Sequence, residues 1–158
     1  MDKEAETIIR AVCDTSVLVP SRYRKKFHQA AEAGLFVPMW SPWIIGELYR
    51  VLSWKWAETH GTTDEQWRVC SEKANTMMLL LEQCWTLVDS RQPWPLAWSS
   101  LEDEFDKPVF ATAVRGGAHY VVSNNTHDFL PANKQGRHVW QGIEYMTAPV
   151  FLSDVLRI

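Results

Sequence analysis

Short apolar runs alternate along the chain with longer segments in which apolar positions recur every three or four residues. The short runs predict buried strands over residues 8–13, 35–40, 85–88, 119–123 and 143–147. The longer segments predict helices over residues 16–33, 42–60, 63–84, 106–115 and 150–156. Strands that alternate with helices in this way indicate an α/β fold, an α/β/α sandwich around a parallel sheet of about five strands.

Signals at the ends of the predicted helices support these boundaries. Gly34 closes the first helix as a C-cap, and Ser41 precedes Pro42 as the N-cap of the second. Residues 63–66 have the spacing of a capping box. Because the sequence has no repeat, low-complexity tract or linker, residues 1–158 are expected to form a single domain.

The composition limits the functions that the chain could have. The chain has 158 residues, 46% of them hydrophobic, which is enough for a core. A net charge of -3 creates no global positive field for nucleic acid, although a carboxylate cluster would itself lower the charge. The cysteines, Cys13, Cys70 and Cys84, are odd in number and lack metal-ligand spacing. With no signal-peptide pattern and no membrane-spanning run, we expect a cytoplasmic protein with reduced thiols and no membrane contact.

Four acidic residues stand in apolar segments or beside strand ends: Asp14, Glu47, Asp106 and Asp128. A carboxylate in such a place is costly unless something neutralises its charge. Sites of open parallel sheets form at the carboxyl ends of the strands, where Asp14 and the segment after the 119–123 strand both lie. Carboxylates that meet at this edge would hold a hard divalent cation.

Each of these acids also has a simpler explanation when taken alone. Asp14 could act only as the N-cap of the following helix. Glu47 could pair with Arg50 or Lys55 on its own helix. Asp106 could only favour the positive end of its helix, and the fourth acid could be an ordinary loop residue. The metal-site hypothesis therefore depends on the four acids together.

In combination, these residues and their surroundings resemble the PIN domain, the nuclease fold of VapC-type toxins and several RNA-processing enzymes. The resemblance covers nearly the whole chain and is carried by residues 12–19 (VCDTSVLV), 44–48 (IIGEL), 103–113 (DEFDKPVFATA) and 118–129 (AHYVVSNNTHDF). By resemblance, Asp14, Glu47 and Asp106 match the three best-defined acidic positions of the family. Ser123 matches its small hydroxyl residue after the fourth strand.

The chain departs from the family pattern at one position. Many relatives carry an aspartate two residues after the hydroxyl, where this chain has Asn125. An amide oxygen can still bind a cation, but it brings no charge. The resemblance to a subgroup of bacterial PIN proteins implies that Asp128 supplies the carboxylate instead.

The resemblance implies a Mg²⁺- or Mn²⁺-dependent ribonuclease, in the subgroup of toxins from toxin–antitoxin pairs. The bound ion would mask phosphate charge, lower the pKa of a water molecule and stabilise the leaving oxygen. The implied catalytic and metal-binding residues are Asp14, Glu47, Asp106, Asp128 and, for the metal only, Asn125. Ser16 and Ser123 would donate hydrogen bonds to these ligands.

A basic segment and many tryptophans suggest partners for the acidic site. Arg22, Arg24 and Lys25 follow Asp14 closely enough to bind RNA phosphates, although a solvated helix face would have the same sequence. The nine tryptophans are difficult to bury in one domain, so some could stack on bases or face a protein partner. The family resemblance implies a homodimer and, for toxins, an antitoxin whose peptide occupies the active-site groove.

Two other functions fit parts of the pattern. A PIN-fold module that binds RNA or protein without catalysis would explain Asn125. A phosphatase of the haloacid dehalogenase type would use Asp14 as its nucleophile, but it expects a second aspartate where this chain has Ser16. No glycine-rich phosphate loop follows any predicted strand, which argues against nucleotide-binding classes.

Overall fold

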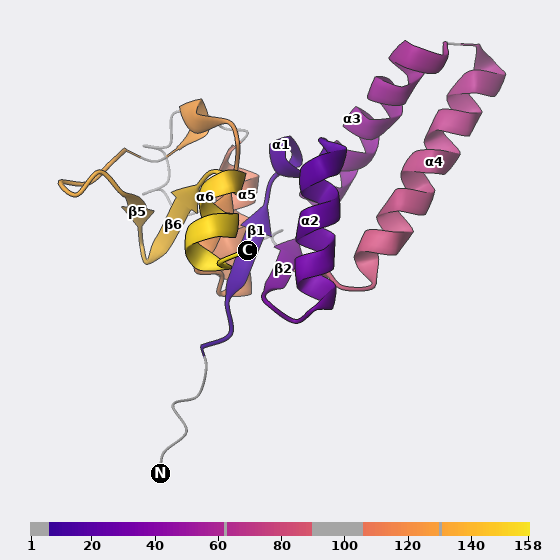
Figure 1. Cartoon of the computed structure of the whole chain (residues 1–158). Coiled ribbons are helices and arrows are strands. Elements are labelled where there is room, and N and C mark those ends of the chain that lie inside the picture. The colour runs from indigo at the N-terminus through magenta and orange to yellow at the C-terminus, as the bar shows by residue number, and fades with distance from the viewer. Residues whose placement is uncertain (1–6, 62, 90–105, 130) are drawn as a thin grey trace.

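A mostly parallel sheet forms the centre of the molecule, for which we have a computed structural model that describes residues 7–61, 63–89, 106–129 and 131–158 (Figure 1). The strand order is β3-β2-β1-β4-β6-β5. Neighbouring strands pair in parallel, except that β5 runs antiparallel to β6. The strands are β1 (Arg10–Cys13), β2 (Val37–Trp40), β3 (Thr86–Leu87), β4 (Tyr120–Val122), β5 (His138–Trp140) and β6 (Ile143–Met146). The five predicted strands are confirmed, with ends up to two residues shorter.

The sixth strand, β5, was not predicted from the sequence. Its three residues are all only half-buried, so they form no continuous apolar run. It is created by a tight turn at Gln141 and Gly142, whose φ angles are 51° and 77°. Two consecutive positive φ angles are typical of the type I′ turn, which suits the twist of a hairpin. β5 therefore pairs with β6 through local turn geometry at the edge of the sheet.

Six α-helices and two short turns of other helix types join the strands in the described part of the chain. The α-helices are α1 (Thr15–Leu18), α2 (Ser21–Glu32), α3 (Pro42–His60), α4 (Asp64–Glu82), α5 (Asp106–Gly116) and α6 (Ala148–Val150). A 3₁₀ turn, η2 (Thr126–Asp128), follows β4, and a π-helical turn, η3 (Phe151–Val155), follows α6. The prediction of one helix over 16–33 is wrong, because Pro20 breaks it. Pro20 has no N–H to continue the helical ladder, and its ψ of 122° is extended.

Helices cover both faces of the sheet, which confirms the α/β/α arrangement. On one face, Phe27 of α2 stacks on Phe151 of η3 with ring centroids 5.7 Å apart, and Tyr120 of β4 meets Phe151 edge-on. On the other face, Phe110 of α5 stacks on Tyr145 of β6. Burial of these rings supplies much of the apolar area that stabilises the fold.

Helices α3 and α4 form an antiparallel pair that extends away from the sheet (Figure 1). The predicted capping box at Thr63 and Gln66 is present and starts α4. Trp54 of α3 meets Trp67 of α4 edge-to-face at 5.4 Å, and both rings remain partly exposed. Among the helices of the described ranges, none has the length and apolar character of a membrane span.

Candidate functional site

Asp14 lies directly after β1, at the carboxyl end of a central strand. Its backbone N–H continues the pairing with β4 by donating to the Val122 carbonyl at 3.0 Å. Its side chain caps α1, because Oδ1 accepts a hydrogen bond from the Ser16 N–H at 2.9 Å. The N-cap role that the sequence suggested is therefore real. The cap uses Oδ1, so the other interactions of this carboxylate depend mainly on Oδ2.

Two serine hydroxyls from different segments hold this carboxylate. The Ser16 hydroxyl donates to Asp14 Oδ1 at 2.5 Å, and the Ser123 hydroxyl donates to Oδ2 at 2.6 Å. Ser123 is 1% exposed, so its orientation is fixed by the surrounding core. Ser16 and Ser123 thus occupy the supporting positions that the sequence predicted, one after β1 and one after β4.

Asn124 completes a network that ties three segments together, and sequence analysis did not single it out. Its backbone N–H donates to the Ser16 hydroxyl at 2.9 Å, and its side-chain Oδ1 accepts from the Ala148 N–H at 3.0 Å. Asn125 donates its backbone N–H to the Ser123 hydroxyl at 3.1 Å. The only signal in the sequence was the polar run that follows β4. This run orients both serines toward Asp14.

Burial raises the pKa of the Asp14 carboxyl above its usual range, and the hydrogen bonds from Ser123 and Ser16 lower it only in part. The ionised form is therefore under-compensated by the protein alone. A positive charge beside Oδ1 or Oδ2 would remove this cost. The neighbouring Cys13 thiol does not supply such a charge. Burial and then the charge of Asp14 raise the pKa of Cys13 well above its ordinary value.

Two further hydroxyls at this edge are buried without a hydrogen-bond partner within the described residues. They are Thr15 Oγ1 after β1 and Ser41 Oγ after β2. The prediction that the Ser41 side chain caps α3 is wrong in this respect: Ser41 occupies the N-cap position, but its hydroxyl accepts no hydrogen bond from the helix N–H groups. Carboxylate and hydroxyl oxygens at the ends of these strands are hard donors, which suit Mg²⁺ or Mn²⁺ better than soft metals.

The topology places the other predicted acids at the same edge of the sheet. Glu47 lies in the second turn of α3, directly after β2, and is half-buried. Asp106 opens α5, whose far end leads into the start of β4, so the helix begins at the carboxyl edge. Asp128 ends η2, after β4. The side chains of Asp106 and Asp128 are outside the described part of the structure, so the meeting of the four carboxylates stays a prediction.

The basic segment on α2 divides into residues of different kinds. Arg24 is 7% exposed, and its Nη1 donates to the Leu18 and Val19 carbonyls at 2.9 and 2.8 Å. This guanidinium satisfies the carbonyls at the end of α1, so the prediction that Arg24 binds RNA is wrong. Arg22 and Lys25 are exposed and keep the predicted role as candidates.

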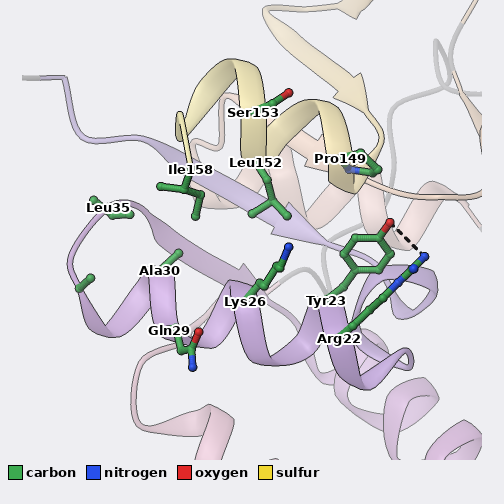
Figure 2. Close-up of a pocket in the computed structure, with 11 residues that line it drawn as sticks. Arg22, Tyr23, Lys26, Gln29, Ala30, Leu35, Pro149, Leu152, Ser153 and Ile158 are labelled. Carbon is green, nitrogen blue, oxygen red and sulfur yellow. Dashed lines mark hydrogen bonds between the residues drawn. The ribbon is translucent and has the colours of Figure 1, made fainter.

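A pocket of about 590 Å³ lies between α2 and the C-terminal segment (Figure 2). Arg22 and Lys26 line it one helical turn apart, and Arg22 packs over the Tyr23 ring at 4.6 Å. Figure 2 shows Lys26 directed from α2 toward Leu152. Sequence analysis chose Lys25 instead of Lys26, although the spacing of four residues from Arg22 would have favoured Lys26.

Comparison with known proteins identifies the family. A family model described as PIN domain matches residues 10–127, a range that contains Asp14, Glu47 and Asp106 and ends one residue before Asp128. No curated protein and no solved structure matches the chain. Since the matched range is well over half of its length, the chain belongs to the PIN domain family. Proteins of this family are typically nucleases that use divalent metal ions.

Proposed function

We propose that this PIN domain protein is a Mg²⁺- or Mn²⁺-dependent ribonuclease, with VapC-type toxins as its functional class. The observation that carries the proposal is the Asp14 carboxylate. It is half-buried at the carboxyl end of a central strand, where desolvation raises its pKa, and two serine hydroxyls from different segments hold it. A carboxylate used only for capping needs neither the second hydroxyl nor the burial. In a carboxylate that binds a cation, the hydroxyls fix the orientation of the oxygens, and the bound cation offsets the cost of burying the ionised form.

The roles that we propose for the acids are those that the family resemblance implies. A bound Mg²⁺ or Mn²⁺ supplies charge neutralisation on the phosphate and a more acidic water molecule. Asp14 and Asp106 would hold the ion directly, while Glu47 would orient the attacking water. Asp128 would add the fourth carboxylate. Asn125 would contribute its amide oxygen, close to the Ser123 hydroxyl that its N–H already contacts.

RNA would approach along the start of α2. This helix begins one short turn after Asp14, so its first residues lie near the acidic edge. Arg22, Lys25 and Lys26 bring positive charge to a region where the acids would otherwise repel the phosphate backbone. The contacts would be to phosphates and independent of base sequence.

A protein partner is part of the proposal. Trp54, Leu79 and Leu80 expose about half of their surface on the α3–α4 pair. Exposed apolar groups on a projecting pair of helices support an interface, either in a homodimer or with an antitoxin in the cytoplasm.

The decisive experiment measures cleavage of single-stranded RNA with Mg²⁺, Mn²⁺ or EDTA. Wild-type protein should cleave with either ion and stop in EDTA, while Asp14→Asn and Asp106→Asn should be inactive. Glu58→Gln is the matched control, since it removes one exposed carboxylate from α3 about three turns beyond Glu47. Cleavage that survives Asp14→Asn would refute the proposal. Binding of Mn²⁺ without cleavage of any RNA would favour the alternative, an RNA- or protein-binding module on a PIN fold.

A further inference from the structure

Three side chains with metal-binding atoms meet on the α2 side of the molecule, away from the acidic edge. His28 and Glu32 lie one turn apart on α2, and His28 Nε2 is 3.2 Å from Glu32 Oε1. Cys84 joins them from the segment between α4 and β3. One donor atom from each residue lies within 4.8 Å of the other two. A nitrogen, an oxygen and a sulfur donor therefore converge from two segments far apart in the sequence.

The topology separates this group from Asp14. β3 is parallel to β2, and Cys84 lies just before its first residue, at the amino end of the strand. His28 and Glu32 belong to the C-terminal half of α2, the half nearest the start of β2. In Figure 1 the connection that leaves α4 passes beside the lower end of α2. The group thus sits at the edge of the sheet opposite Asp14.

The geometry points to a Zn²⁺ site formed by His28, Glu32 and Cys84, and we propose that the protein binds zinc there. Zinc bonds of about 2.0–2.3 Å place neighbouring ligands of a tetrahedral site about 3.3–3.7 Å apart. The distance of 3.2 Å between His28 Nε2 and Glu32 Oε1 is already close to this ligand-to-ligand distance. Cys84 Sγ, within 4.8 Å of the other two donor atoms, would take the third corner. A water molecule would take the fourth position.

His28 Nδ1 is buried and makes no hydrogen bond within the part of the chain that the structure describes. Zinc held by Nε2 would leave Nδ1 as it is, so the proposal rests on the convergence of the three donor atoms. The donor set also selects the metal, because a thiolate with an imidazole favours zinc over Mg²⁺ or Mn²⁺.

The other two cysteines do not compete for this ion. Cys13 is fully buried, and burial raises the pKa of its thiol well above the ordinary value. Cys70 is 1% exposed inside α4. Cys84 is the partly exposed thiol and the one beside a histidine. Zinc at this position would tie α2 to the connection between α4 and β3, so it would stabilise the fold without touching the acidic edge.

The test titrates EDTA-treated, fully reduced protein with Co²⁺, which reports its ligands by colour, and then displaces it with Zn²⁺. We expect one Co²⁺ per chain with a thiolate charge-transfer band and the intense visible bands of tetrahedral cobalt. Both should be present in wild type and in Asp14→Asn. The charge-transfer band should vanish in Cys84→Ser, and the tetrahedral bands should be lost in His28→Gln and weakened in Glu32→Gln. An acidic, oxygen-only site gives pale six-coordinate cobalt without the thiolate band, so the two sites are distinguishable.

A second readout is thermal unfolding with Zn²⁺. At about 100 times its Kd, zinc should raise the Tm of wild type by about 5 °C or more, and it should raise the Tm of His28→Gln and Cys84→Ser clearly less. All three substituted side chains are partly exposed, so the metal-free variants should unfold close to the wild-type temperature. The proposal is overturned if the thiolate band is absent from wild type or persists in Cys84→Ser. Equal zinc-induced Tm shifts in wild type and variants would also overturn the proposal. His28 and Glu32 would then form only an ion pair between residues one turn apart on α2.

Discussion

The change of Asp14 to asparagine should have opposite effects on stability with and without metal. In the metal-free protein, burial raises the pKa of Asp14, so the folded state binds a proton more tightly than the unfolded chain does. The ionised carboxylate therefore costs stability above the folded pKa, and the cost disappears as the pH falls through that value to below the unfolded one. Asp14→Asn keeps the shape and removes this cost. At neutral pH in EDTA, the variant should unfold at or above the wild-type temperature.

Metal should reverse that order. At a Mn²⁺ concentration about 100 times its Kd, binding stabilises the wild type by about 2.7 kcal/mol. For a chain of this length that corresponds to a Tm increase of about 5–11 °C. If loss of the charged ligand weakens binding about 100-fold, the same Mn²⁺ stabilises the variant by about 0.4 kcal/mol, or roughly 1–2 °C. The difference between the two shifts is large enough to measure.

The assay is thermal unfolding followed by circular dichroism, in EDTA and across a Mn²⁺ series at pH 7, then in EDTA at lower pH. Glu58→Gln serves as the charge-matched control and should shift with Mn²⁺ as the wild type does. Equal Mn²⁺ shifts in wild type and Asp14→Asn would refute the metal role of Asp14. An Asp14→Asn variant that is clearly less stable than wild type in EDTA would refute the reasoning about burial, and it would identify the carboxylate as a stabilising cap alone.

Five other substitutions test separate parts of the proposed function. Arg24→Ala should lose about 3 kcal/mol in urea unfolding, because two charge-assisted bonds to carbonyls disappear. Arg22→Ala should instead stay within about 0.5 kcal/mol of wild type and flatten the salt dependence of RNA binding by about one unit. Ser123→Ala should weaken Mn²⁺ binding about 10–100-fold by calorimetry, while an unchanged Kd would make Ser123 purely structural. Asp128→Asn should reduce RNA cleavage far more than Asn125→Ala, and the opposite order would make the amide the working ligand.

The elements that could be predicted are those whose periodicity reflects burial. β1, β2, β4 and β6 read as strands because they contain apolar residues that lie in the core. α3 and α4 read as helices because caps and glycine mark their ends. β5 escaped prediction because an edge strand formed by a turn leaves little apolar signal. The break between α1 and α2 could have been found from Pro20 alone, since proline in a helix interior removes a backbone donor.

The candidate site could be predicted only as far as local sequence encodes it. Asp14 was singled out because it stands at a strand end, and Ser16 and Ser123 were predicted from the family resemblance; the structure brings these three together. Arg24 was misjudged because a basic run looks the same whether a guanidinium faces solvent or turns inward. Its role depends on where the α1 carbonyls lie, which is a property of the tertiary structure. Cys84 was dismissed for the same reason, since its partners on α2 are more than fifty residues away.

The two ends of the sheet differ in the kind of donor atoms they carry, and this difference has a physical basis. At the carboxyl edge, the segments after β1 and β4 present carboxylate and hydroxyl oxygens that are hydrogen-bonded to one another, so the donor atoms are fixed before any ion arrives. Mg²⁺ and Mn²⁺ require such oxygen donors and near-ideal geometry. At the amino edge, His28 and Cys84 offer a nitrogen and a sulfur on partly exposed side chains that can adjust. Zinc tolerates that adjustment because it has no geometric preference of its own. On the two proposals made above, the chain would therefore carry an oxygen-only site at the carboxyl edge and a site with nitrogen and sulfur donors at the amino edge.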